Sequence, residues 1–175
     1  MFGRLFGKEG REIRQARQQW WRSADAAAQQ PTADAVAALE NSMVPAGDAA
    51  DDYEMQVEML DGLRHLLVVA GAATLPLVET QHRVIGTDRC HFLAPVSVAS
   101  GGDASGKLLL TDHRAILTGG GAPRTWAWHR VRRFEREGYD LQIMTGGDDF
   151  LILRCNTFGD ALLAWHIGNR LRERA

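Results

Sequence analysis

The chain has 175 residues, of which 45% are hydrophobic and 24% charged, with a formal net charge of −2 at neutral pH. This composition is ordinary for a folded globular protein and disfavours extended disorder, collagen-like fibre and a multi-span membrane protein. The longest mostly apolar run, 63–78, falls short of the roughly 20 residues that a membrane span needs. Because the first 30 residues do not combine a basic start, an uninterrupted apolar stretch and a small-residue cleavage site, we read no secretory signal and expect a cytoplasmic protein.

Charge divides the sequence into a basic, an acidic and a nearly balanced segment. Residues 1–30 carry six Lys and Arg against three Asp and Glu, whereas residues 31–62 carry eight Asp and Glu and no Lys or Arg. Opposite charges on neighbouring segments indicate either helices that pack together or a basic arm that meets an acidic partner or anionic lipid. Pairing within the chain is the simpler interpretation.

Helix-forming residues dominate the first part of the chain. Ala, Gln, Arg and Glu prevail over Lys8–Gln30, which predicts one helix, and Pro31 suits the first turn of a second helix that extends to about residue 41. A third helix is expected to be capped by Asp48, to carry an apolar face at i+3 and i+4 spacing, and to end near Gly71. We therefore predict a helical region over residues 1–75.

After Leu75 the sequence changes to short β-rich runs separated by glycines, which predicts six or seven strands. The runs cover residues 88–99, 107–118, 124–130, 131–137, 141–145 and 150–155. Asp112 and His113 split the second run into the two strands of a hairpin, and Pro95 inside the first run indicates an edge position or a bulge. The spacing is typical of a meander.

The last predicted element is a helix that follows Thr157. Asp160, three residues further on, resembles the second residue of a capping box, with a carboxylate in place of the usual Glu. The apolar side of this helix suits the open end of a small barrel. We predict an α+β fold, in which N-terminal helices precede an antiparallel β-barrel of six or seven strands over residues 76–175, capped by the C-terminal helix.

The hairpin carries a family pattern. The run Gly106–Leu117 places Thr111 and Arg114 in the order G-x-L-x-L-T-x-x-R followed by apolar residues. This order resembles the hairpin of bacterial pleckstrin-homology-like (PH-like) and GRAM-like domains. Residues 126–131 and 160–171 look like the short strand and the closing helix of that family. The resemblance covers about half of the chain and implies a PH-like barrel, a fold that hosts many functions.

The best-known members of this family bind phosphoinositides through basic residues on the first two strands and the loop between them. The equivalent loop here, Ala99–Gly106, contains Asp103 and no Lys or Arg, and only Lys107 stands at its edge. A phosphate site needs several convergent donors. The sequence therefore argues against phosphoinositide binding at this loop.

Residues with metal-binding or catalytic chemistry are scattered along the chain. Different predicted strands and turns carry the potential ligands Cys90, His91, His113, His129 and Cys155. Their spacing lacks the paired knuckle of a structural zinc site. No nucleophile motif, dinucleotide fingerprint or P-loop occurs. We therefore predict no metal, no cofactor, no catalytic residue and no enzymatic activity.

Two clusters are candidate binding surfaces, and the first is basic. It comprises Arg130, Arg132, Arg133 and Arg136. Alternation places Arg130, Arg132 and Arg136 on one face and Arg133 on the other. Glu135 and Glu137 dilute the charge of this cluster, and the chain as a whole is slightly acidic. The pattern therefore favours a solvated strand face over a nucleic-acid footprint.

The second cluster lies at the extreme N-terminus and mixes apolar with basic residues. Its members are Phe2, Arg4, Leu5, Phe6, Lys8 and Arg11. The segment resembles a short basic amphipathic helix that could lie on an anionic membrane. We favour packing of its apolar residues on another helix or on a second subunit, because Gly3, Gly7 and Gly10 weaken a helix there.

These observations predict a non-catalytic binding or scaffold module. We expect it to recognise a protein partner and to oligomerise through its N-terminal helices. The alternative is peripheral association with an anionic membrane through the basic N-terminus. A third interpretation, a small apolar ligand held inside the barrel, requires a cavity that sequence does not reveal.

Overall fold

The computed structural model describes residues 3–44, 50–99, 105–119, 121–146 and 150–175. Contacts divide the chain into two compact units, Met1–Leu67 and Val68–Ala175. Among the described residues, no helix combines the length and the hydrophobicity that a membrane crossing requires.

The first unit is built from three helices, α1 (Gly3–Gln29), α2 (Ala33–Asn41) and most of α3 (Ala50–Gly71). All three were expected from the sequence. The prediction that Pro31 occupies the first turn of α2 is wrong, because the N-cap is Thr32, whose Oγ1 accepts a hydrogen bond from the Ala35 amide at 3.2 Å. The expected cap of α3, Asp48, lies outside the described residues.

Buried tryptophan and opposite charges hold the three helices together. Trp20 is buried and its indole Nε1 donates to the Leu39 carbonyl at 3.0 Å, which ties α1 to α2. Arg17 of the basic segment pairs with Asp52 of the acidic segment at 3.0 Å. The interpretation that the two charged segments pair within the chain is confirmed at this contact.

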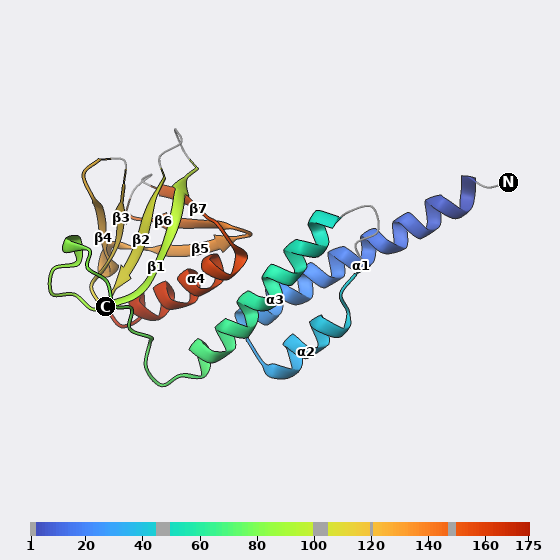
Figure 1. Ribbon diagram of the computed structural model, residues 1–175, viewed down its shortest axis with the longest axis horizontal. Helices are drawn as coiled ribbons and strands as arrows, with labels where there is room; N and C mark the ends of the chain where they lie inside the picture. The colour runs from blue at the N-terminus through green and yellow to red at the C-terminus, as the bar shows by residue number, and fades with distance from the viewer. Residues whose placement is uncertain (1–2, 45–49, 100–104, 120, 147–149) are drawn as a thin grey trace. The chain divides into compact units, whose positions relative to one another are not determined.

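The second unit contains a seven-stranded antiparallel sheet (Figure 1). Its strands are β1 (Cys90–Val98), β2 (Ser105–Thr111), β3 (Arg114–Thr118), β4 (Arg124–Ala127), β5 (Arg133–Glu137), β6 (Asp140–Met144) and β7 (Phe150–Cys155). The strand order is β4-β3-β2-β1-β7-β6-β5, so two meanders meet where β1 pairs with β7. The sheet does not close, because no described residue of β4 pairs with β5.

One helix, α4 (Phe158–Arg172), follows the last strand and packs on this sheet. The Thr157 half of the predicted capping box is confirmed, since the Asp160 amide donates to Thr157 Oγ1 at 3.0 Å. Ala161, Ala164 and Ile167 of α4 join a core that fills the space between helix and sheet. The predicted fold class, helices followed by a PH-like sheet and a C-terminal helix, is confirmed, with a barrel that stays open between β4 and β5.

Two local predictions are corrected. The predicted strand 124–130 ends at Ala127 and continues as a 3₁₀ turn, η2 (Trp128–Arg130), because the Val131 amide bonds back to the Trp128 carbonyl at 2.9 Å. β1, which contains Pro95, is the central strand of the sheet rather than an edge strand, and its register shift lies between Cys90 and Phe92 rather than at Pro95. Proline is tolerated there because β1 pairs with β7 only from Val96 onward.

Candidate functional site

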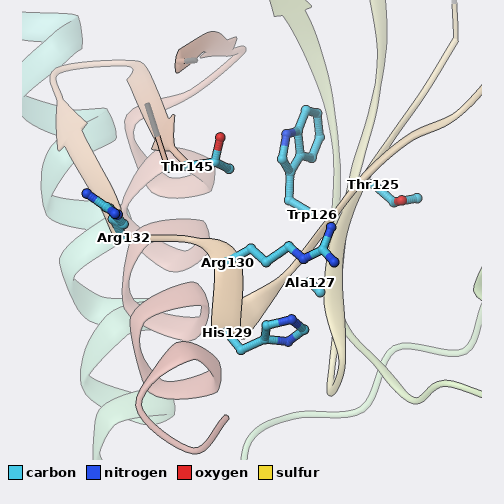
Figure 2. A pocket seen from close by; sticks show the side chains of 8 residues that line it. Thr125, Trp126, Ala127, His129, Arg130, Arg132 and Thr145 are labelled. Carbon is cyan, nitrogen blue, oxygen red and sulfur yellow. The ribbon is translucent and has the colours of Figure 1, made fainter. Parts of the chain in front are cut away.

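A cleft of about 720 Å³ opens beside β4, on the side where the sheet does not close (Figure 2). We call it the β4 cleft and define it by its lining residues Thr125, Trp126, Ala127, His129, Arg130, Arg132, Thr145 and Gly146. They come from β4, from η2 and the residues after it, and from the end of β6. The cleft therefore lies at the gap between the two edges of the open sheet.

A buried tryptophan fixes the turn that carries Arg130. Trp128 is fully buried, and its indole Nε1 donates to the Thr111 carbonyl at 2.7 Å. The ring also meets Phe134 edge to face, with ring centroids 6.0 Å apart. Arg130, two residues later, is exposed and extends from η2 toward β4 (Figure 2). Its position is thus set by the core rather than by a free loop.

A second arginine lines the same cleft. The Arg132 amide donates to the Met144 carbonyl at 2.8 Å, which joins this residue to the end of β6. Its guanidinium lies beside Gly146, where an added Cβ atom would come within 3.9 Å of Nε. Among the described residues, the cleft lining includes no Asp or Glu, and neither Arg130 nor Arg132 forms an ion pair. The described lining is therefore positively charged.

An aromatic side chain forms part of the wall. Trp126 is half-buried, and the guanidinium carbon of Arg124 lies 5.2 Å from the centroid of its ring. This is a cation–π geometry. It places a third positive charge next to the cleft.

Backbone groups of β4 also face the open side of the sheet. The Trp128 amide donates to the His113 carbonyl at 3.2 Å, and the register pairs Ala115 with Trp126. In an antiparallel pair, hydrogen-bonded and non-hydrogen-bonded residues alternate. The N–H and C=O groups of Thr125 and Ala127 therefore point away from β3, toward the open edge, and both residues line the cleft.

Side chains of α4 cover the opposite edge of the sheet, at β5. On β5, the Phe134 carbonyl accepts a hydrogen bond from Asn169 Nδ2 of α4 at 2.9 Å. The Arg132 carbonyl accepts another from Arg172 Nη1 of the same helix. Side chains of α4 thus occupy this edge, a known way of protecting edge strands. Within the described residues, Thr125 and Ala127 of β4 have no such cover.

Other residues of the predicted basic surface and loop lie elsewhere. Arg136 does not line the β4 cleft, and its Nη1 donates to the Gly138 carbonyl at 3.1 Å. Lys107, at the edge of the β1–β2 loop, is exposed and lies 3.5 Å from His82 Nε2. Most of that loop, residues 100–104, is outside the described residues. The structure therefore brings together Arg130 and Arg132 but not Arg136.

The N-terminal candidates are described only in part. α1 begins at Gly3, so Phe2 lies outside the described residues, whereas the segment with Arg4, Leu5, Phe6 and Lys8 is helical. The side chains of that segment lie outside the description. Arg11 is exposed.

A cluster that sequence reasoning missed lies beside the β2–β3 hairpin. One ligand atom each from Asp88, Asp112 and His113 comes within 4.8 Å of the others. Both carboxylates are already paired, Asp88 with Arg114 at 2.9 Å and Asp112 with Arg89 at 3.0 Å. Burial raises the pKa of Asp112, but the hydrogen bonds from Arg89 outweigh it and hold this pKa below its usual value. These ion pairs explain the cluster, because they join the β2–β3 hairpin to the residues just before β1.

The potential zinc ligands named from the sequence have ordinary surroundings. Cys90 and Cys155 are buried free thiols, and burial raises the pKa of both. His91 is buried, with Nδ1 2.7 Å from the Pro76 carbonyl. His113 and His129 are exposed.

The described residues thus combine a PH-like fold with a basic cleft beside a sheet edge that none of them covers. No protein-family model matches the sequence, and no curated protein matches it.

Similar solved structures include the C-terminal domain of an unknown protein from Leishmania infantum, at 10% identity and TM-score 0.41, covering 50% of this chain and 88% of that one. The FERM and C-terminal domain complex of Drosophila Merlin matches at 12% sequence identity with a TM-score of 0.44, and the match covers 87% of this chain and 54% of that one. The PDZ-RhoGEF DH/PH domains, solved with activated RhoA, match at 10% sequence identity with a TM-score of 0.45. This match covers 95% of this chain and 54% of that one. The chain spans about half the length of these last two. Such similarities extend no function to this chain.

Proposed function

We propose that the chain is a non-catalytic recognition module whose second unit binds a protein partner at the β4 cleft. The observation that supports this most directly is the outward direction of the Thr125 and Ala127 backbone groups beside two arginines that form no ion pair with a described residue. The PH-like fold by itself fixes no function, so the proposal depends on this site.

The chemistry of the edge favours a polypeptide over other ligands. An edge residue offers an N–H donor and a C=O acceptor at a fixed spacing. An extended peptide matches both groups in register, which is how strand addition to a sheet edge gives affinity. Lipid headgroups and nucleic-acid backbones present anionic oxygens that would engage Arg130 and Arg132, but they lack the alternating N–H and C=O groups by which an extended peptide pairs in register with a sheet edge.

Affinity capture with matched variants tests the proposal. Full-length protein, an Arg130→Glu/Arg132→Glu variant and an Arg133→Glu control would be compared as baits in one lysate of source cells. Arg133 is exposed, adjacent in sequence and outside the cleft lining, and its partner is Glu135. The proposal expects a protein that is retained by wild type and control and lost with the double variant. Identical recovery with all three baits would contradict it.

We further propose that the helices of the first unit mediate self-association. Tyr53 and Val57 lie one turn apart on α3, and each keeps 39% of its surface exposed. Paired exposed apolar residues at this spacing suit contact with another helix. Light scattering should give a mass above that of the monomer for the full chain, and Tyr53→Glu/Val57→Glu should reduce it. A monomeric wild-type protein would exclude self-association.

The alternative function is peripheral binding to an anionic membrane. It is supported by the helical conformation of α1 down to Gly3, which is longer than the glycines in this segment suggest. A helix with basic and apolar residues on opposite sides binds anionic lipid more strongly at low salt. Flotation with phosphatidylserine vesicles tests it, and Leu5→Glu/Phe6→Glu should abolish flotation. Wild-type protein that stays at the bottom of the gradient would exclude this alternative.

A further inference from the structure

We infer that the segment recognised at the β4 cleft is an extended acidic stretch of the partner protein, which adds to β4 as an eighth strand. This inference rests on the proposed function and specifies its ligand. Three observations carry it: a sheet edge that no described residue covers, two arginines without an acidic partner among the described residues, and a cleft that joins them.

The uncovered edge sets the conformation of the ligand. β4 has four residues, Arg124–Ala127, and only Thr125 and Ala127 direct backbone groups outward. Thr125 offers one donor and one acceptor, whereas Ala127 offers its amide donor, because its carbonyl is at the N-cap of η2 and serves the first bond of that turn. Because strand residues rise about 3.3 Å each, an added segment of about four residues spans this edge. The ligand must therefore be extended over a short distance and must keep its own amide hydrogens.

The arginines set the charge of the ligand. Arg130 extends from η2 toward β4, and Arg132 lies beside Gly146 on the other side of the cleft (Figure 2). Guanidinium groups bind carboxylates through two parallel hydrogen bonds, stronger than those between neutral groups. Asp148 and Asp149 follow Gly146 in the sequence and lie outside the described residues. Over the described lining, the only charge is positive.

The strand repeat then sets the order of residues in the ligand. Alternate side chains of a strand point to opposite faces. A segment with acidic residues at every second position would direct its carboxylates to one face, where the arginines lie, while its other side chains point away. Acidic residues alternating with β-formers such as valine satisfy both requirements.

Fluorescence anisotropy with a labelled peptide of alternating glutamate and valine tests the inference on the full-length protein. We expect saturable binding that weakens as NaCl rises from about 50 to about 500 mM, because added salt screens the charge attraction. Arg130→Gln/Arg132→Gln should weaken binding about tenfold or more, whereas Arg133→Gln should leave it within about twofold. Circular dichroism of each variant checks that it is folded.

Two further peptides separate charge from strand pairing. Replacing every glutamate by glutamine removes the carboxylates and should abolish measurable binding. Methylating alternate backbone nitrogens on the edge-facing side keeps the carboxylates but removes amide donors, and should also weaken binding about tenfold or more. Full affinity of the methylated peptide would overturn strand addition, and full affinity of the glutamine peptide would overturn the role of charge.

The inference and the proposed function fail in different ways. If the acidic peptide does not bind but capture still distinguishes wild type from the Arg130→Glu/Arg132→Glu variant, the acidic strand is wrong and the proposed site stands. If neither peptide binding nor capture distinguishes wild type from the double variant, both the acidic strand and the proposed site are wrong. Binding of phosphatidylserine vesicles that is lost in the same double variant, without peptide binding, would assign the cleft to a membrane instead.

Discussion

The indole Nε1 of Trp128 donates a hydrogen bond to the Thr111 carbonyl at 2.7 Å, across 17 positions of sequence and inside the core. This bond joins the end of β2 to η2, the turn that follows β4. Arg130 belongs to the same turn and lines the β4 cleft. The hairpin and the candidate site are therefore held by one buried contact.

Trp128→Phe should destabilise the second unit by about 1–3 kcal/mol, because the buried Thr111 carbonyl would lose its partner and the smaller ring would leave a void. Urea unfolding followed by circular dichroism measures this loss. Trp126→Phe is the matched control, since Trp126 is only half-buried and its indole nitrogen makes no hydrogen bond to a described residue. Equal losses in both variants would contradict the account of the Trp128 bond.

Thr111→Val should cost about 1–3 kcal/mol although the side chain keeps its shape. The buried Thr111 Oγ1 donates toward the Arg114 carbonyl at 2.9 Å, lies 3.1 Å from Asp88 Oδ2, and accepts from the Arg114 amide at 3.1 Å. Valine offers neither donor nor acceptor. Thr118→Val, at an exposed hydroxyl, should change the free energy of unfolding by less than about 0.5 kcal/mol. A Thr111 effect as small as the control would show that the hydroxyl is dispensable.

Gly168→Ala should be destabilising, contrary to the usual preference of helices for alanine. A Cβ atom there would lie 2.5 Å from Cε1 of Phe134, so α4 would have to move away from β5, at a cost of about 1–3 kcal/mol. Gly71→Ala, where nothing lies within 4 Å of the added atom, should be neutral or slightly stabilising. Thermal unfolding compares the two variants, and a stabilising Gly168→Ala would contradict the close packing of α4 on Phe134.

Stability should fall in alkaline solution through Cys155. Burial, with smaller effects of Asp160 and Asp140, raises the pKa of this thiol to about 12. In the unfolded chain the thiol titrates near about 8.5. Between these values the unfolded state loses a proton that the folded state keeps, so rising pH favours unfolding. Cys155→Ala should show a weaker decline in stability from pH about 8.5 upward, measured by urea unfolding against pH. If stability falls with pH as steeply in Cys155→Ala as in wild type, other titratable groups cause the loss.

Local signals in the sequence accounted for most of the fold. Capping at Thr157 and the split of the hairpin at Asp112 and His113 each depend on neighbouring residues, and both were correct. The end of β4 at Ala127 could not be predicted, because it depends on the bonds of Trp128 to His113 and Thr111. The central place of β1 was missed for the same reason, since strand order is set by long-range pairing.

The candidate site was only partly accessible from sequence. The density of arginine pointed to Arg130 and Arg132, but strict alternation grouped them with Arg136. In the structure Arg130 belongs to the turn η2 and Arg136 to β5, and Arg136 does not line the cleft. The exposed edge of β4, which no described residue covers, was missed because it depends on which strand α4 protects. The Asp88–Arg114 pair was also missed, although Arg114 belongs to the family pattern.

Amide hydrogen exchange at single-residue resolution, with and without the acidic peptide, tests the central claim most directly. Thr125 and Ala127 should exchange quickly in the free protein and become protected on binding, whereas Trp126, already bonded to β3, should be protected in both states. If the peptide binds and leaves the Thr125 and Ala127 amides unprotected, the ligand contacts only the arginines, and strand addition at β4 is wrong.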